Sequence, residues 1–379
     1  MYQHATNQPP RRPAEVFPPG DFIREELDER DWTQGDLAKI IGRPEAAINL
    51  IVNDKRGITP DTAVELAAAF DTSAEYWLNL DTAYRLSKVA APTDEIQRRA
   101  SIYRTSPVKE MVRRGWINYS ESAEGLAFEV EKFYSVVDFN EMKLAARSSD
   151  SGSTPTAEQL AWCVRCLHLA RSIPVRRYVE WRLPECKAKL RKLAAFPESV
   201  AAVPKVLAEF GIRYVLVEHI KRSKIDGAAL WLGSEWDKPV IALSLRYDRI
   251  DWFWHTLCHE LSHIEHKDGS SALIDVDMSV GGDDAAPLSE IEARANREAA
   301  EMLIPVGKID SYILRKRPTF SRVSVLQFAN ANKIHPGIVV GQLHHRLGNY
   351  QLFRDMLVRI KGIAITTALH DGWGSESEE

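Results

Sequence analysis

The residues best suited to chemistry form the run from His259 to His263, which reads H-E-L-S-H. The run lies within Asp251–Lys267, where the spacing of apolar residues predicts an amphipathic helix. Residues four apart on a helix share one face, so His259 and His263 can hold a single metal ion from one side. Glu260, about 100° around the helix from His259, can direct its carboxylate at a water beside that ion. This combination is what a metal-dependent peptide hydrolase requires.

A site of this type needs a third protein ligand, which we expect from a neighbouring helix. The pattern predicts that helix over Ser289–Leu303, ended by Pro305. Glu292 and Asn296 lie one turn apart beside its apolar face. We therefore predict that Glu292 binds the metal and that Asn296 braces Glu292 or a histidine ligand. The spacing of Ser289 and Glu292 also fits a capping box, which gives the Glu292 carboxylate an alternative role.

Three neighbouring residues are weaker candidates for the site. His255 and His266 flank the motif at helical spacing and are alternative ligands. We expect instead a partly exposed His255, and a His266 stabilised at the helix C-terminus by the helix dipole. Glu298 is predicted on the far side of its helix from Asn296, in solvent.

Composition defines a broad class. A length of 379 residues predicts two or three domains with ample buried core, and 45% hydrophobic and 27% charged residues are typical of a soluble globular protein. No apolar run is long enough to span a bilayer, and the polar N-terminus lacks a secretory signal. Four cysteines in a chain of this size do not indicate a disulfide framework. We therefore expect a cytoplasmic protein that does not bind membranes.

Local patterns predict a multidomain α+β fold: an all-α helix-turn-helix module, a helical middle segment, and a C-terminal α+β domain with a small sheet. The boundaries that we predict are a disordered N-terminus over 1–16, the module over 17–90, a helical connector over 91–147, a Ser/Thr-rich linker over 148–156, the α+β domain over 157–365 and an acidic tail over 366–379. Strands are predicted at Arg213–His219, Ala228–Leu232 and Val240–Leu245. A late helix pair, Ser321–Asn332 and Pro336–Leu347, has a helix-turn-helix outline.

Charge is unevenly distributed along the chain. Phe17–Arg85 contains seven Lys/Arg and fourteen Asp/Glu, a net charge of −7. Val306–Lys361 contains ten Lys/Arg and two Asp/Glu, a net charge of +8. Segments of opposite sign favour different partners or mutual contact.

The segment Arg246–Pro305 resembles the ImmA/IrrE family of metallo-endopeptidases. Its signature is H-E-L-x-H, then E-x-x-A-N-x-F-A, then L-x-P; the matching residues are His259–His263, Glu292–Ala299 and Leu303–Pro305, with Pro239–Leu243 upstream. The resemblance covers roughly Ala201 to Lys361. It implies a zincin-like domain in which His259, His263 and Glu292 bind zinc, with manganese as the alternative metal, and Glu260 is the catalytic base. It also implies a helix-turn-helix repressor as substrate.

The chain departs from this signature at two positions. Ser262 stands where glycine is usual, and Glu298 stands where an aromatic residue is usual. A serine is small enough to be tolerated. The acid replaces a core residue, which puts the packing of its helix in doubt but leaves the ligands in place.

The segment Phe17–Tyr84 resembles the Cro/C1-type helix-turn-helix domain and, within it, the HigA-like antitoxins. The matching residues are Pro19–Leu27, Thr33–Ala38, Asn53–Pro60 and Tyr76–Leu80. The resemblance implies that Thr33–Ile41 crosses the DNA backbone and that Pro44–Asn53 enters the major groove. It assigns phosphate contacts to Gln34, Arg43 and Lys55, and base contacts to Glu45, Ala46 and Asn49. Operator DNA and a homodimer are the implied partners.

The net charge of the module weakens the DNA-binding prediction. DNA affinity comes largely from neutralised phosphates, and this module carries a net charge of −7. Glu45 and Ala46 are poor hydrogen-bond donors to bases. The alternative is that the fold serves in dimerisation or in binding a toxin. A basic cluster of Arg43, Lys55 and Arg56 on one face favours DNA.

Together these features predict a DNA-binding transcriptional regulator with a zinc-dependent endopeptidase domain that cleaves a repressor or antitoxin-type protein. The alternative is a non-enzymatic, HigA-like antitoxin and autorepressor that uses the peptidase fold as a scaffold for a toxin. A third hypothesis is a sensor that cleaves its own linker near Ser148–Thr156.

Overall fold

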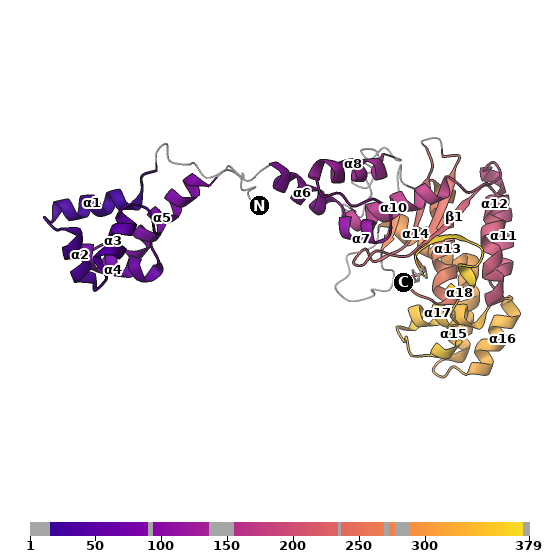
Figure 1. Cartoon of the computed structure of the whole chain (residues 1–379). Helices are drawn as coiled ribbons and strands as arrows, with labels where there is room; N and C mark the ends of the chain where they lie inside the picture. Colours follow the sequence, from indigo (N-terminus) through magenta and orange to yellow (C-terminus); the bar gives the residue numbers. More distant parts are fainter. Residues whose placement is uncertain are drawn as a thin grey trace. The chain divides into compact units, whose positions relative to one another are not determined.

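The computed structural model describes residues 16–89, 94–135, 155–233, 236–268, 273–276 and 289–373. The chain divides after Thr93 into two compact units, and helices predominate in both (Figure 1). Among the described residues, no helix is both long enough and apolar enough to cross a membrane.

The first unit is a bundle of short helices. They are α1 (Pro19–Glu29), α2 (Gln34–Ile41), α3 (Glu45–Val52), α4 (Pro60–Phe70) and α5 (Ala74–Lys88). Thr33 caps α2 in a capping box, and Thr59 and Ser73 cap α4 and α5. Gly42, in the left-handed region with φ of 70°, ends α2 and permits the tight turn into α3. Each predicted helix is present, and α5 extends further than the sequence indicated.

The second unit consists of a mixed sheet with helices on both faces. Its helices are α6 (Asp94–Thr105), α7 (Val108–Arg113), α8 (Ala123–Tyr134), α10 (Ala157–Ala170), α11 (Leu183–Leu193), α12 (Val203–Glu209), α13 (Ile250–His266), α14 (Glu290–Leu303), α15 (Val306–Lys316), α16 (Arg322–Asn332), α17 (Pro336–Leu347) and α18 (Lys361–Ala364). Its strands are β1 (Arg213–Val217), β2 (Ile225–Trp231), β3 (Pro239–Leu243), β4 (Leu273–Val276) and β5 (Leu369–Asp371). The sequence missed α15, which follows Pro305, β4, which lies in a polar stretch, and the short α18. It also missed β5, which pairs with β1 and lies in the segment predicted as an acidic tail, so the domain extends beyond its predicted end at 365.

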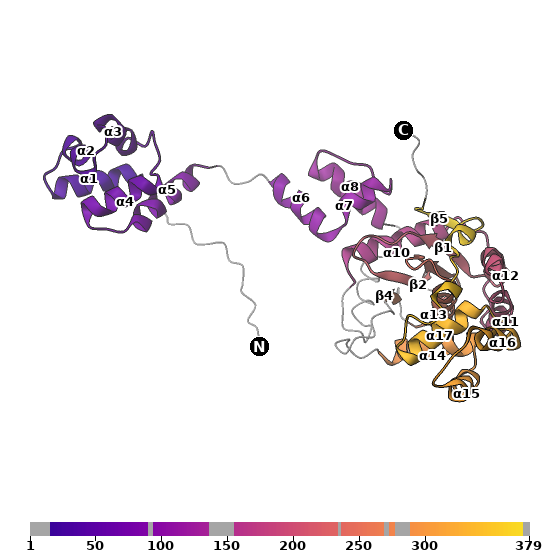
Figure 2. The same ribbon diagram turned by 90° about the horizontal axis from the view of Figure 1, so that it is seen from below.

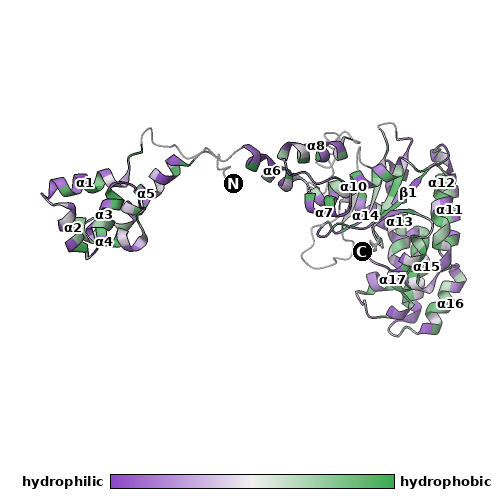
Figure 3. Ribbon diagram, viewed as in Figure 1, coloured by the Kyte–Doolittle hydropathy of each residue, from purple (hydrophilic) through white to green (hydrophobic). Residues whose placement is uncertain are grey.

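The sheet has the strand order β4-β2-β3-β1-β5. Strand β1 pairs in parallel with β3 and β5, whereas β2 is antiparallel to β3 and β4. Alternate residues face opposite sides: Val215 and Val217 join the core with α10, whereas Tyr214 and Leu216 join the core with α13. Figure 2 shows α10 on one side of the sheet and α13 with α17 on the other. The apolar colour of β1 and α13 in Figure 3 reflects this double coverage.

The predicted connector extends the second unit over residues 94–135. Val108, Met111 and Phe133 share a core with α10 and the sheet. Arg114 donates hydrogen bonds to the carbonyls of Glu218 and His219, at 2.7 and 2.9 Å. These contacts fix α7 and α8 to the sheet. Residues 136–147 and most of the predicted linker lie outside the described residues.

The late helix pair has a helix-turn-helix turn, but its second helix is largely covered by α13. Lys333, with φ of 51°, ends α16 as Gly42 ends α2, and three residues separate the helices in both pairs. However, α17 packs against α13, and Ile338, Val339 and Leu343 are buried. Because α17 is covered, the pair supports α13 instead of presenting a recognition helix.

Candidate metal centre

The central feature of the second unit is a buried cluster of two histidines and an acid. His259 and His263 lie one turn apart on α13 and are 0% and 1% exposed. Their Nε2 atoms are 2.8 Å apart. Glu292, from the first turn of α14, places Oε2 3.1 Å from His259 Nε2 and Oε1 3.7 Å from His263 Nε2. The structure thus brings together the three residues predicted to bind a metal.

These separations fit a zinc ion. Zinc binds nitrogen and oxygen ligands at about 2.0–2.2 Å in a tetrahedral arrangement, which places ligand atoms about 3.3 Å from one another. The three separations bracket that value. The capping-box alternative for the Glu292 carboxylate is wrong: the Ser289 hydroxyl accepts a hydrogen bond from the Glu292 amide, but the carboxylate itself lies against the imidazoles.

A hydrogen-bond partner orients each imidazole. His259 Nδ1 lies 3.0 Å from Asn296 Oδ1, as the prediction for Asn296 required. His263 Nδ1 lies 3.0 Å from a carboxylate oxygen of Asp268. A proton on each Nδ1 leaves the Nε2 lone pair directed at the cluster, the tautomer needed for metal binding.

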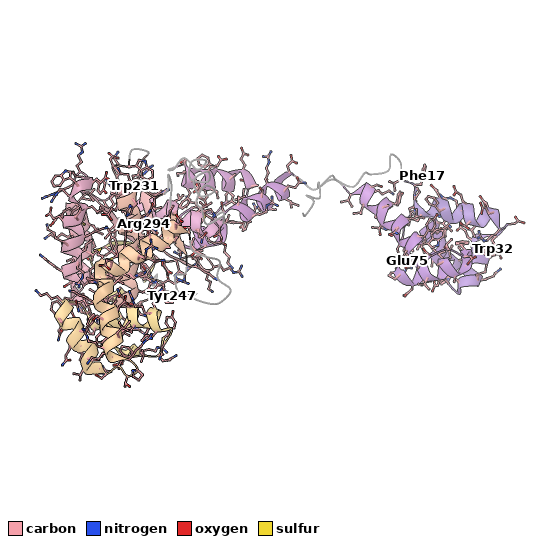
Figure 4. The ribbon with its side chains drawn as sticks, turned by 180° about the vertical axis from the view of Figure 1, so that it is seen from behind. Phe17, Trp32, Glu75, Trp231, Tyr247 and Arg294 are labelled. Atoms are coloured by element: carbon pink, nitrogen blue, oxygen red, sulfur yellow. The ribbon has the colours of Figure 1, made fainter. Side chains whose placement is uncertain are left out.

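Sequence reasoning missed Asp268. It follows Lys267, whose left-handed conformation ends α13 and turns the chain back toward His263. Arg294 of α14, labelled in Figure 4, bonds the same Asp268 carboxylate. The sequence feature that could have indicated this partner is an acid five residues after His263.

The electrostatics of the site favour the protonation states that bind metal. Burial lowers the pKa of His263, an effect larger than the opposing hydrogen bond to Asp268, so the ring stays neutral. Burial raises the pKa of Glu292, but the hydrogen bond and charge interaction with His259, together with His263, outweigh it and lower that pKa overall. Both shifts favour a neutral His263 ring and an ionised Glu292 carboxylate, the forms that bind metal.

The predicted base, Glu260, is fully buried on α13 beside strand β2. A Cβ atom added at Gly227 would lie 2.6 Å from Glu260 Oε1 and 2.8 Å from Thr256 Cγ2. Gly227 therefore provides the space that the Glu260 carboxylate occupies. The sequence feature that could have indicated this is a glycine inside a strand pattern, which often marks a place where another group packs closely against the backbone.

The alternative ligands His255 and His266 lie outside the cluster. His255 is half-buried, with Nε2 3.2 Å from Asn296 Oδ1. His266 Nε2 lies 2.9 Å from Glu298 Oε1. The prediction that Glu298 lies in solvent is wrong, because its carboxylate also accepts a 2.6 Å hydrogen bond from the Ser262 hydroxyl. The small Ser262 side chain leaves room for it against α13.

In the first unit, the predicted base-contacting residues lie on the exposed side of α3. Glu45, Ala46 and Asn49 are exposed, and Asn49 Nδ2 donates a 3.3 Å hydrogen bond to Gln34 Oε1 at the start of α2. This contact joins the helix predicted to cross the DNA backbone to the helix predicted to read bases. Lys55 is also exposed.

The expected basic cluster is smaller than predicted. The Arg43 guanidinium forms an ion pair with Glu65 of α4, with Nη2 3.1 Å from Oε1. The hydrogen bond to Glu65 raises the pKa of Arg43, and the acid offsets its charge. Arg43 therefore does not present a free charge to a phosphate, whereas Lys55 and Arg56 remain exposed.

Comparison with known proteins identifies the first unit. The helix-turn-helix family model matches residues 23–77. Virulence-associated protein I of Dichelobacter nodosus is 44% identical over 69 residues, 18% of this chain and 64% of that protein. Virulence-associated protein A of the same organism is 36% identical over 78 residues, 20% of this chain and 74% of that protein. The solved structure of Pseudomonas aeruginosa antitoxin HigA with the higBA promoter is 38% identical and covers 19% of this chain and 80% of that chain, with a TM-score of 0.19.

Through its first unit, the chain belongs to the helix-turn-helix family, and the unit is of the Cro/C1, HigA-antitoxin-like type. The chain spans 64% of the length of virulence-associated protein I. Each of these three matches covers about a fifth of this chain.

Proposed function

We propose that the protein is a DNA-binding transcriptional regulator whose second unit is a zinc-dependent endopeptidase of the ImmA/IrrE type. Its substrate is a repressor or antitoxin-type protein. The observation that carries the proposal is the convergence of His259, His263 and Glu292 on one buried point, with Glu260 on the same helix.

The donor set favours a catalytic centre over a structural one. Structural zinc sites use four protein ligands, whereas catalytic sites use three and leave a position open. Among the described residues, three side chains contribute to this cluster. A zinc ion held there would supply a Lewis acid that polarises a scissile carbonyl and acidifies a water.

The chain's own residues perform the remaining steps. Asn296 and Asp268 hold the two imidazoles in the tautomer that leaves Nε2 unprotonated. Glu260 accepts a proton from the attacking water and delivers it to the leaving amine. Its burial beside Gly227 shields the carboxylate from bulk solvent.

The first unit is proposed to bind operator DNA. Its support is the helix-turn-helix family match, the exposed Asn49 on α3 and the bridge from Asn49 to Gln34. A solved relative is described as antitoxin HigA with the higBA promoter, which supports the same use here. We also propose a homodimer, because helix-turn-helix regulators commonly bind as dimers to two half-sites one helical turn apart.

Cleavage of a candidate substrate tests the peptidase. The purified protein, loaded with zinc, is incubated with a repressor or antitoxin encoded beside its own gene, and products are followed by intact mass. We expect a discrete cleavage that EDTA and Glu260→Gln both abolish, while Glu260→Gln retains zinc. Cleavage that persists in Glu260→Gln contradicts the assigned base.

A second candidate function is a non-enzymatic antitoxin and autorepressor. The observation that favours it is the acidic first unit, whose Arg43 is paired with Glu65 and whose net charge is −7. Such a surface suits a basic protein partner better than phosphates. Zinc binding without hydrolysis, combined with a tight complex with a toxin, would support this function over the peptidase.

A further inference from the structure

We propose that Glu298 is a positioning residue for the metal centre: with Ser262 and His266, it locks α14 onto α13 and thereby sets where Glu292 meets the two imidazoles. The inference rests on the proposed zinc site and identifies a determinant of its geometry.

The contact is a three-residue bridge between two helices. Ser262 Oγ donates a 2.6 Å hydrogen bond to Glu298 Oε2, and His266 Nε2 lies 2.9 Å from Glu298 Oε1. Ser262 is fully buried, whereas the Glu298 side chain is 35% exposed. Ser262 and His266 are one turn apart on α13, so a single carboxylate from α14 spans that turn.

The bridge affects the ligands because they come from both helices. Helix α13 carries His259 and His263, and α14 carries Glu292. The distance from the carboxylate to the imidazoles therefore depends on how α14 is spaced and rotated against α13. Contacts from Asn296 and Arg294 fix one part of α14. Buried Ala299 also packs in the core that α14 shares with α13. Glu298, six residues or about 9 Å beyond Glu292, adds a polar attachment that helps to fix the rotation of α14.

Ser262 and Glu298 are also the two positions where the chain departs from the signature of the family that it resembles. The departures bond each other. The hydroxyl at one departure therefore satisfies the carboxylate at the other, and the contact attaches α14 to α13. From sequence alone, an acid at position 298 puts the packing of its helix in doubt. The hydrogen bond from Ser262 shows how this acid is accommodated.

The experiment measures metal binding by the full chain. Zinc affinity is determined by competition with a chelator, and the visible absorption spectrum of the Co²⁺-loaded protein reports ligand geometry. We expect Glu298→Ala to weaken zinc binding about 10-fold and to change the cobalt spectrum. Glu298→Gln, which keeps a hydrogen-bond acceptor for Ser262, is expected to restore most of the affinity. Ser262→Ala combined with Glu298→Ala is expected to cost no more than Glu298→Ala alone.

Arg297→Ala, at an exposed neighbouring position on α14, is the matched control and is expected to leave both readouts unchanged. Wild-type zinc affinity and cobalt spectrum in Glu298→Ala, even with a lower melting temperature, would overturn the inference and leave the zinc site standing. Fully additive effects of the two alanine substitutions would also overturn it. A wild-type protein that binds neither ion would overturn the zinc site itself, and the inference with it.

Discussion

Replacing Gly227 with alanine is expected to separate catalysis from metal binding. The added Cβ would lie 2.6 Å from Glu260 Oε1, 2.8 Å from Thr256 Cγ2 and 3.1 Å from Leu243 Cδ2. Ordinary contacts begin at 3.4 Å, so the carboxylate must retreat by about 0.8 Å. A misplacement of about 1 Å costs a catalytic group about 100-fold in rate. We therefore predict a loss of about 100-fold in kcat.

The same substitution is expected to leave zinc affinity within about twofold of wild type, because the nearest atoms to the new methyl group belong to no metal ligand. Overpacking is expected to lower the free energy of unfolding by about 1–3 kcal/mol. The assay combines zinc competition, thermal unfolding and cleavage of the peptide that wild-type protein cuts fastest in a random mixture. Gly307→Ala, where an added Cβ meets no atom within 4 Å, is the control. A folded Gly227→Ala protein that cleaves at the wild-type rate would refute the position assigned to the base.

Three further predictions follow from other contacts. Asp268→Asn is expected to weaken zinc binding about 10-fold or more, because the carboxylate orients His263; isothermal titration with unchanged affinity would rule out that role. Glu65→Gln is expected to free Arg43 for a phosphate and so to strengthen operator binding. The slope of log affinity against log salt concentration, measured by fluorescence anisotropy, should steepen by about one phosphate contact. An unchanged slope would argue against a phosphate near Arg43. Hydrogen bonds from Arg113 and Arg114 lower the pKa of Glu110 from 4.5 to about 2, so its stabilising effect is complete above pH 4.5 and is lost as the pH falls toward 2. Glu110→Gln should therefore destabilise the protein in urea at pH 7 by about 1–3 kcal/mol, a difference that must shrink below pH 4.5.

The placement of the metal ligands was predictable because it depends on helical period. His259 and His263 share a face by virtue of a spacing of four, and Glu292 and Asn296 share one on the next helix. Those two local patterns suffice to anticipate a cluster once the helices pack together.

The residues that sequence reasoning missed depend on tertiary contacts. Asp268 reaches His263 only because Lys267 turns the chain back, and Gly227 matters only because Glu260 packs against β2. The same limit explains the error at Glu298: helical periodicity gives its angle on α14, but not that α13 presents the small Ser262 opposite it.

The basic face of the first unit shows a related limit. Charge counts identify Arg43 but cannot reveal that α4 places Glu65 against it. The helix-turn-helix outline of α16 and α17 likewise depends on local turn residues, whereas the burial of α17 depends on α13. Local geometry was therefore predictable for both pairs, but the ion pair on Arg43 and the burial of α17 were not.

The most direct test of the zinc site is the metal content of the purified full-length chain and of four single variants. One zinc ion per wild-type chain is predicted, lost in His259→Ala, His263→Ala and Glu292→Ala, and retained in His370→Ala, which alters an exposed histidine on β5. A wild-type chain without zinc, or a Glu292→Ala chain that binds zinc with wild-type affinity, would contradict the account.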